Sequence, residues 1–179
     1  MRNVSLFLMI FLCFPVYATV DVHFTPSSKC ENLIVNMINN SKKTIDAAVY
    51  SINNKQIVAA LKNAHDRGVK LRILTDKLQA SSKYSKVKDL YLYGVGIKVN
   101  SKYKIEHNKF AVFDGNKVST GSFNWTNNAS KSNSENCLFV YRDKKTIKAY
   151  KKRFNELWKI NSAEKSEAWF EKNKVYKTK

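Results

Sequence analysis

The sequence predicts an α/β fold in which a mixed β-sheet is sandwiched between helices. Two observations lead to this prediction. Short apolar runs of strand type alternate with amphipathic segments of helical period along most of the 179 residues, a pattern typical of βα units. Gly115-Asn116 also forms a tight turn between two apolar runs, so part of the sheet must be antiparallel.

The first half of the chain predicts three strands separated by two helices. The strands alternate in polarity or contain buried apolar runs, and the helices carry apolar residues at i, i+3 and i+4. Asn54 can cap the second helix and Gly68 can end it. The expected strands are residues 20–24, 44–50 and 69–75, and the first helix begins after Ser27 or Ser28.

The second half predicts four more strands and a long helix. Gly94 ends a shorter helix over residues 84–93. The expected strands are residues 95–99, 109–113, 117–120 and 135–141. The long helix has one apolar stripe, formed by Ile147, Tyr150, Phe154, Leu157 and Trp158.

The N-terminus predicts a secretory signal peptide over residues 1–18. Arg2 precedes an apolar run of 11 residues, and Val16 and Ala18 fit a small-residue cleavage site. The alternative is an uncleaved membrane anchor, although a bilayer span needs about 20 apolar residues. We expect one domain over residues 19–160, a basic and aromatic tail over residues 161–179, and a secreted or periplasmic protein after cleavage near Ala18.

The formal net charge of +18 suggests a polyanionic partner, either nucleic acid or an anionic membrane surface. The basic residues are 27 lysines and 5 arginines, beside 19 asparagines, which is what a general compositional bias would produce. Sites that bind phosphate in a bidentate manner favour arginine. The charge therefore supports an anionic partner without choosing among the candidates.

Two features leave alternatives open. Cleavage after Ala18 would leave Cys30 and Cys137, which an exported protein can join in a disulfide or keep as two buried thiols. The long helix also carries many cations, which suit either a polyanion groove or an ordinary solvated face. These cations are Lys144, Lys145, Lys148, Lys151, Lys152 and Arg153.

One segment holds polar residues in an arrangement suited to phosphate chemistry. His107 and Lys109 are two residues apart at the start of a predicted strand, so both side chains share one face. An imidazole can attack phosphorus, and an ammonium can neutralise the non-bridging oxygens. Ser122 and Asn124 have the same spacing and supply neutral donors, while Glu135 can hold the far imidazole nitrogen and fix its tautomer.

This segment resembles the phospholipase D superfamily, whose motif is H-x-K-x4-D followed by G-S-x-N. The resemblance covers most of the chain after residue 18, including residues 44–51 and 57–76. It implies a phospholipase D-like fold and catalysis through a phosphohistidine, without a metal or another cofactor. By position, it makes His107 the nucleophile, Lys109, Ser122 and Asn124 the phosphate ligands, and Glu135 the residue that orients the histidine. Asp114 completes the catalytic motif, mainly as structural support.

The chain carries one copy of this motif, whereas larger members of the family join two copies in one site. The reaction needs one histidine to attack and a second to protonate the leaving oxygen. His23 and His65 lack the pattern and fit ordinary structural positions. We therefore expect a C2 homodimer with the active site on the two-fold axis, as in small relatives.

Three functions compete at this point. The first is a phospholipase D that hydrolyses phosphatidylcholine to phosphatidic acid and choline at a membrane surface, including host membranes. The second is a non-specific, metal-independent endonuclease. The third is a basic module that binds nucleic acid or membranes without catalysis, which the intact motif argues against. Because the net positive charge is what a general compositional bias would produce and the tail is aromatic, the lipid is the preferred substrate. Trp169, Phe170 and Tyr176 in that tail either enter a membrane interface or close over the domain or its partner.

Overall fold

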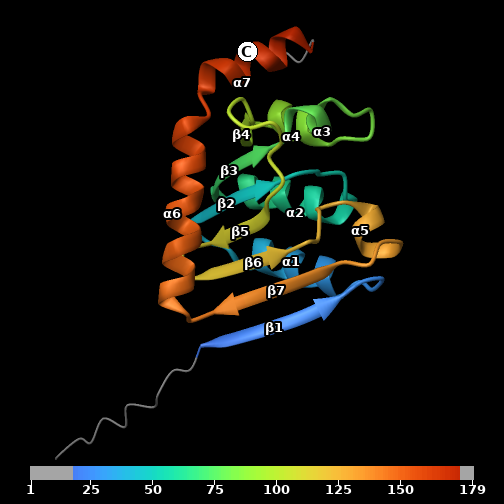
Figure 1. The fold of residues 1–179 in the computed structure, drawn as a ribbon, viewed down its shortest axis with the longest axis vertical. Helices are drawn as coiled ribbons and strands as arrows, with labels where there is room; N and C mark the ends of the chain where they lie inside the picture. Colours follow the sequence, from blue (N-terminus) through green and yellow to red (C-terminus); the bar gives the residue numbers. More distant parts are fainter. Residues whose placement is uncertain (1–17, 174–179) are drawn as a thin grey trace, which may run out of the picture.

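The computed structural model describes residues 18–173, which form a seven-stranded mixed sheet between helices (Figure 1). The strand order is β1-β7-β6-β5-β2-β3-β4. The β2–β3 and β3–β4 pairs are parallel, and the other pairs are antiparallel. The strands are β1 (Thr19–Phe24), β2 (Thr44–Val49), β3 (Lys70–Thr75), β4 (Gly96–Val99), β5 (Lys109–Phe113), β6 (Lys117–Gly121) and β7 (Asn136–Tyr141).

The helices cover the two faces of the sheet unequally. The main core cluster joins one face to α1, α2, α4 and α7, whereas the clusters on the other face contain helix residues from α6 alone. The alternation of β5 shows the two sides, because Ala111 and Phe113 belong to the main core while Phe110 and Val112 lie under α6. The helices are α1 (Lys29–Asn40), α2 (Lys55–Asp66), α3 (Lys77–Ser81), α4 (Val87–Leu92), α5 (Asn127–Lys131), α6 (Lys144–Ile160) and α7 (Ala163–Lys172).

The predicted fold class is confirmed, the helix predicted at residues 84–93 needs correction, and the short helices α3 and α5 were not predicted. The helix expected at residues 84–93 is shorter, because only α4 is helical there, and α3 precedes it. The Asp76 side chain caps α3 by accepting from the amides of Leu78 and Gln79. This signal was present in the sequence, but α3 has only five residues and too little apolar periodicity to be recognised.

The expected C-terminal tail contains α7, which packs on the domain. Phe170 is fully buried in the main core and stacks on Tyr91 with ring centroids 3.7 Å apart. Ser166 is also buried, and its hydroxyl accepts a hydrogen bond from the Val99 amide of β4. For Trp169 and Phe170, closure over the domain therefore replaces the membrane-interface alternative, while Tyr176 lies outside the described residues.

A disulfide joins Cys30 at the start of α1 to Cys137 in β7, with Cα atoms 5.9 Å apart. Both residues are buried, and 107 positions separate them in the sequence. The sequence left this pairing open, and the structure shows the disulfide. Among residues 18–173, no helix is long and apolar enough to cross a membrane. The apolar run of the predicted signal peptide lies outside the described part of the chain.

Candidate active site

The predicted site residues gather at the edge of the sheet that is formed by one set of strand ends. The parallel strands β2, β3 and β4 end at this edge, and the antiparallel strand β5 begins there. β6 also ends at this edge, and β7 starts there. In Figure 1 the edge is the one that carries α3 and α5, while α6 crosses the opposite ends of the strands. Ladder pairing thus brings together residues 107–109, 122–124 and 135, which are up to 28 positions apart.

His107 lies two residues before the start of β5, is exposed to solvent, and packs against Tyr50. The two rings meet edge to face with centroids 4.6 Å apart. Lys109 begins β5, and its Nζ donates a 2.6 Å hydrogen bond to the His107 carbonyl oxygen. The same Nζ lies 4.9 Å from the centroid of the Tyr50 ring. The histidine and lysine therefore share one location, as their spacing predicts, and Tyr50 contacts both.

The environment of Lys109 lowers the pKa of its ammonium below the usual lysine value. Burial is the main cause, and the negative charges of Glu135 and Glu106 oppose it. Glu106 is 1% exposed, and its Oε1 accepts hydrogen bonds from the backbone and side-chain nitrogens of Asn108. The two carboxylates help to keep the partly buried ammonium charged, which a role at phosphate oxygens requires.

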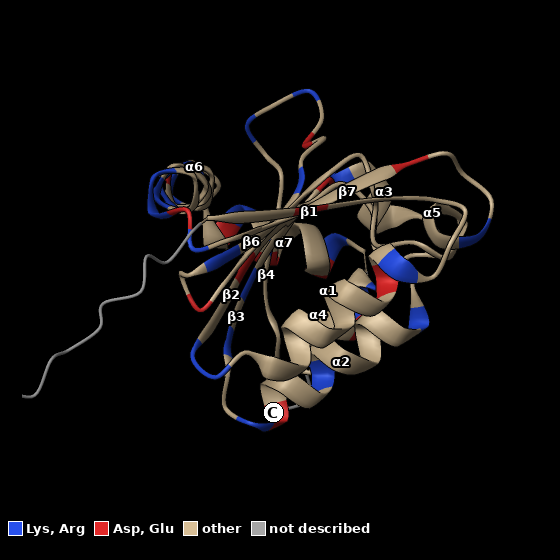
Figure 2. Cartoon of the chain, turned by 90° about the horizontal axis from the view of Figure 1, so that it is seen from below, with Lys and Arg blue, Asp and Glu red and all other residues tan. Residues whose placement is uncertain are grey.

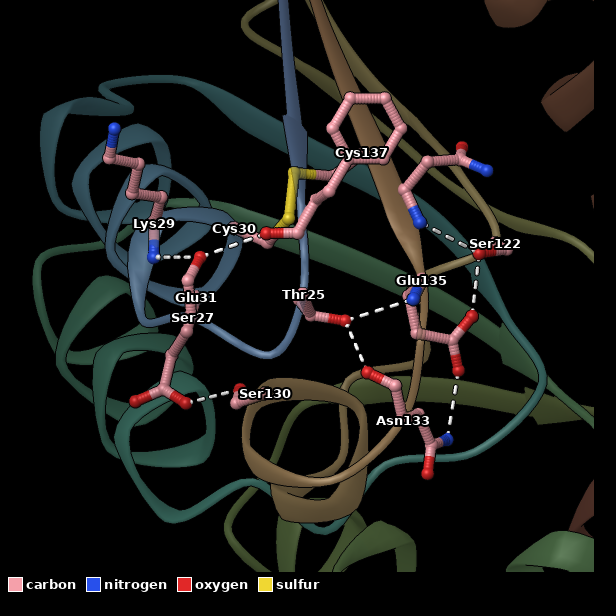
Figure 3. Close-up of a disulfide and its surroundings, with 12 residues drawn as sticks. Thr25, Ser27, Lys29, Cys30, Glu31, Ser122, Ser130, Asn133, Glu135 and Cys137 are labelled. Atoms are coloured by element: carbon pink, nitrogen blue, oxygen red, sulfur yellow. Dashed lines mark hydrogen bonds between the residues drawn. A yellow bond between two sulfur atoms is a disulfide. The ribbon is translucent and has the colours of Figure 1, made fainter.

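Ser122 and Glu135 form the second half of the site (Figure 3). Ser122 Oγ donates to Glu135 Oε2 at 2.5 Å and accepts from the Asn136 amide at 3.0 Å. The other carboxylate oxygen, Oε1, accepts from Asn133 Nδ2 at 2.9 Å. Thr25 Oγ1 accepts from the Glu135 amide and donates to the Asn133 carbonyl oxygen. The glutamate is thus fixed by its side chain and by its backbone.

This geometry changes the role predicted for Glu135. The sequence predicts that Glu135 holds the far nitrogen of His107, but in the described chain its carboxylate oxygens accept from Ser122 and Asn133. Its charge acts instead on Lys109. Spacing could not reveal this, because it depends on how the β6–β7 connection folds back on β1.

Asn124 follows Ser122 on the loop that leaves β6. Its side-chain Oδ1 is buried and has no hydrogen-bond partner within the described chain. A buried polar atom without a partner costs about 1–3 kcal/mol, so such groups are rare outside functional sites. The next residue, Trp125, is 2% exposed and belongs to the main core, so it is a packing residue.

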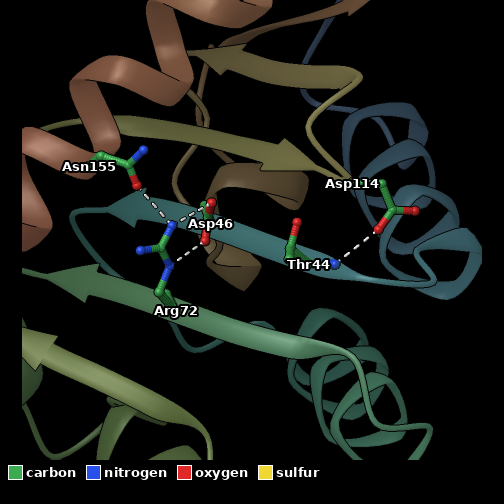
Figure 4. Close-up of polar contacts among 5 residues, drawn as sticks. All are labelled: Thr44, Asp46, Arg72, Asp114 and Asn155. Atoms are coloured by element: carbon green, nitrogen blue, oxygen red, sulfur yellow. Dashed lines mark hydrogen bonds and ion pairs between the residues drawn. The ribbon is translucent and has the colours of Figure 1, made fainter.

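Asp114 lies at the far end of β5 from His107 (Figure 4). Its carboxylate accepts hydrogen bonds from the backbone amides of Lys42, Lys43 and Thr44 at 2.7–3.0 Å. Burial alone would raise the pKa of Asp114, but these three hydrogen bonds outweigh it and hold the pKa below the ordinary value. Asp114 is therefore the structural member of the motif and takes no part among the reacting groups.

Tyr50 is the site residue that the sequence reasoning missed. A signal existed, since Tyr50 directly follows the buried strand β2 at the edge where polar residues collect. The other two histidines stay outside the site: His23 lies near Phe139 in β7, and His65 packs against Tyr93. Within residues 18–173, no group of three or more His, Cys, Asp or Glu side chains could hold a metal ion.

The arrangement combines a solvent-accessible imidazole, a partly buried ammonium and neutral donors at an open edge. These groups suit attack on a phosphorus atom whose oxygens carry negative charge. The geometry of the single chain supplies one imidazole.

Comparison with known proteins agrees with this chemistry. Residues 34–158 match the family described as "Cardiolipin synthase, PLD-like domain". "Phospholipase D" of Rickettsia prowazekii (strain Madrid E) is 36% identical over 133 residues, which cover 74% of this chain and 64% of the relative. This chain thus spans slightly less than two thirds of the Rickettsia relatives it matches. "Mitochondrial cardiolipin hydrolase" of Xenopus laevis is 31% identical, with 82% of this chain and 75% of the relative covered.

A solved structure extends the likeness to the whole fold. Nuc from Salmonella typhimurium, described as a phospholipase D family member, superposes with a TM-score of 0.74. The two chains are 26% identical, and the match covers 82% of this chain and 97% of Nuc. The mixed sheet and its flanking helices are therefore the architecture of a known structural family.

Proposed function

Because this chain belongs to the phospholipase D superfamily, we propose that it is a phosphodiesterase in which His107 attacks phosphorus. The observation that carries the proposal is the pairing of His107 and Lys109 at the open sheet edge. The imidazole is exposed, and Tyr50 restrains its ring. The Lys109 ammonium is fixed on the same backbone segment by its 2.6 Å hydrogen bond.

The reaction takes two displacements at phosphorus. A nitrogen of His107 forms a bond to phosphorus as the bond to the leaving oxygen breaks, and a second imidazolium gives that oxygen a proton. The second imidazole then removes a proton from water, whose oxygen displaces His107 and releases the phosphate monoester. Lys109 and the Ser122–Asn124 loop stabilise the charge on the non-bridging oxygens. None of these steps requires a metal ion.

The preferred substrate is a phospholipid, with phosphatidylcholine hydrolysed to phosphatidic acid and choline. Support comes from relatives named phospholipase D and mitochondrial cardiolipin hydrolase, both of which are named for lipid substrates.

A non-specific endonuclease is the second candidate. The likeness to Nuc, which covers 97% of that chain, and the net charge of +18 favour it. Both candidates use the same attack on a phosphodiester.

The second imidazole belongs, in this proposal, to a second copy of the chain. His23 and His65 both pack elsewhere in the fold, so His107 is the one histidine that residues 18–173 place at the site. A two-fold axis beside His107 would bring two copies of the residue together and supply both the nucleophile and the acid.

The surface that suits this contact begins beside the site. β1 is the outermost strand on one side of the sheet. Val20, Val22 and Phe24 lie on one of its faces and are 52%, 46% and 68% exposed. Phe24 pairs with Asn136, whose amide binds Ser122, so this apolar stripe reaches the active site. An exposed apolar stripe of this kind is typical of an interface. We propose that the second copy covers it.

We also propose that the protein is exported, to the periplasm or beyond, after removal of residues 1–18. The apolar run and the small residues near Ala18 support this location. The Cys30–Cys137 disulfide adds support, because such bonds persist mainly in oxidising compartments.

The function is tested with the purified protein in excess chelator. Choline release from phosphatidylcholine vesicles and nicking of supercoiled DNA are followed in parallel, with His107→Asn as the control. Choline release that the variant lacks supports the lipid assignment, and DNA nicking alone makes the protein a nuclease. If neither substrate is cleaved, the binding-module alternative gains support and the phosphodiesterase proposal fails for these diesters. Sedimentation alongside the kinetics tests the dimer, because a fully active monomer contradicts it.

A further inference from the structure

A basic hollow lies at the end of the sheet opposite the active site. It has a volume of about 1370 Å³ and is bounded by the β5–β6 turn, the β7–α6 connection and the first turns of α6. Five of the residues that line it are cations: Lys117, Arg142, Lys144, Lys148 and Lys151. Thr19, the first residue of β1, also lines it.

Neighbouring carboxylates offset only part of the positive charge of the hollow, since Asp114 lies near Lys117 and Asp143 is part of the lining. Among residues 18–173, the ion pairs are Lys62–Asp89, Arg72–Asp46 and Arg153–Glu156, none of which involves a cation of the hollow. The single acidic residue in the lining is Asp143. Its two carboxylate oxygens cap α6 by accepting from the amide and hydroxyl of Thr146. A cluster of unpaired cations in a concave surface attracts anions strongly.

Two residues with positive φ lie in the turns that bound the hollow. Arg142 has a φ of +62°, a left-handed conformation that non-glycine residues rarely adopt. Gly115, in the turn opposite, has a φ of +67°, and a Cβ there would lie 3.4 Å from Lys151 Nζ. The positive φ alone would strain any other residue at position 115, so both turns that bound the hollow depend on unusual backbone conformations.

The hollow continues as a basic stripe along α6. A shallower depression of about 500 Å³ shares Lys148 and Lys151 with it and extends to Lys152 and Lys159. Its one acidic lining residue, Glu156, forms an ion pair with Arg153. At 1.5 Å per residue, the stripe from Lys144 to Lys159 is about 22 Å long. Figure 2 shows the blue residues of α6 on the side turned away from the sheet. The apolar stripe of the helix, with Phe154 and Leu157 fully buried, faces the sheet.

We propose that this hollow and stripe bind a linear phosphodiester polymer, a nucleic acid, through its backbone phosphates. The length of the stripe matches several successive phosphates, and lysines act as point charges that read no base sequence. A flat membrane fits less well, because it would touch only the rim of the concave hollow.

This binding site is separate from the active site and goes beyond the proposed catalytic function. β5, β6 and β7 run between the two places, because the β5–β6 turn lies at one end of these strands and Ser122 at the other. Binding at the hollow therefore does not depend on turnover at His107, and the two proposals can fail independently.

The test measures binding in the full chain carrying His107→Asn, so that turnover does not interfere. The probe is a fluorescein-labelled 20-nucleotide DNA strand, followed by anisotropy over a series of KCl concentrations. Lys148→Ala/Lys151→Ala removes the two lysines shared by both depressions. Lys165→Ala/Lys172→Ala on α7 removes the same charge from exposed positions outside them and is the matched control.

We expect the α6 pair to raise Kd about tenfold in moderate salt and to reduce the slope of log K against log salt by about 1.4, which is two lost phosphate contacts on a single strand. The α7 pair should leave both quantities nearly unchanged. Equal losses in the two variants would overturn the proposal, since binding would then follow net charge alone. Binding to phosphatidylglycerol vesicles without binding to the DNA strand would also overturn it in favour of a membrane surface.

Discussion

Ser122 Oγ lies 2.5 Å from Glu135 Oε2 and donates a hydrogen bond to it, while accepting one from the Asn136 amide. One hydroxyl therefore joins the end of β6 to the start of β7 and fixes a carboxylate that acts on Lys109. The phosphate site depends on this connection as much as on the motif residues themselves.

Replacing Ser122 with alanine should lower kcat about 100-fold, a loss of the size seen when one preorganised hydrogen bond at an active site is removed. The Asn136 amide loses its acceptor, and Glu135 keeps the hydrogen bond from Asn133 but loses the one from the hydroxyl. Ser132→Ala is the matched control, because Ser132 is exposed near the same connection. Steady-state kinetics and a thermal melt of each variant check the prediction. A Ser122→Ala enzyme with wild-type kcat would show that the hydroxyl has no role in the reaction.

The activity should fall at a lower alkaline pH than an ordinary lysine would allow. Burial lowers the pKa of Lys109, so its ammonium loses the proton before a solvent-exposed lysine does. Glu106 raises that pKa, so Glu106→Gln should move the alkaline limb of the pH–kcat profile to lower pH. The glutamine keeps an oxygen that can accept from Asn108. A limb that stays in place, or moves upward, contradicts the assignment of this limb to Lys109.

Asp114→Asn should destabilise the fold by about 1–3 kcal/mol and leave the chemistry nearly intact, because the carboxylate binds three backbone amides far from His107. Asparagine tolerates the φ of +49° at this position, so the backbone need not change. The folded-state pKa of Asp114 is depressed, so its stabilisation is present above the ordinary value of 3.8 and is lost as pH falls through the folded pKa.

Urea unfolding at pH 7 and at pH 3 measures this difference, with Asp21→Asn in β1 as the control. The gap in unfolding free energy between wild type and Asp114→Asn should be wide at pH 7 and narrow at pH 3. A variant that is stable but inactive would instead return Asp114 to the reacting groups.

Breaking the Cys30–Cys137 disulfide should cost about 2–5 kcal/mol of stability, since the bond closes a long loop between buried residues. Cys137 follows Asn136 and Glu135, so activity should decline together with protection of this segment from hydrogen exchange. The check compares the oxidised protein with Cys30→Ser/Cys137→Ser by exchange and by melting. Unchanged exchange at residues 135–137 would separate the disulfide from the site.

Much of the site follows from the sequence because strand pairing is encoded locally. The alternation of β5 and the turn at Gly115-Asn116 predict where Lys109, Ser122 and Asn124 must lie relative to one another. The capping residue Asn54 likewise begins α2 as predicted, with its side chain bound to two amides. Each of these features depends on neighbours in the chain or on a single strand register.

The rest depends on long-range contacts that no local pattern contains. The partners of Glu135 include Thr25, 110 positions away, and the disulfide spans 107 positions. Tyr50 reaches His107 only because β2 pairs with β5. The sequence leaves two alternatives open for Phe170 in the basic and aromatic tail, and only the packing of α7 on β4 decides between them.

The central claim is that His107 becomes covalently bound to phosphorus, and trapping that adduct tests it most directly. Enzyme in excess chelator is mixed with whichever diester the activity test identifies, quenched within one turnover in alkaline detergent, and digested for mass spectrometry. The account predicts a phosphorus adduct on the peptide containing His107, absent in His107→Asn. Full activity in His107→Asn, or an adduct on a different residue, would contradict it.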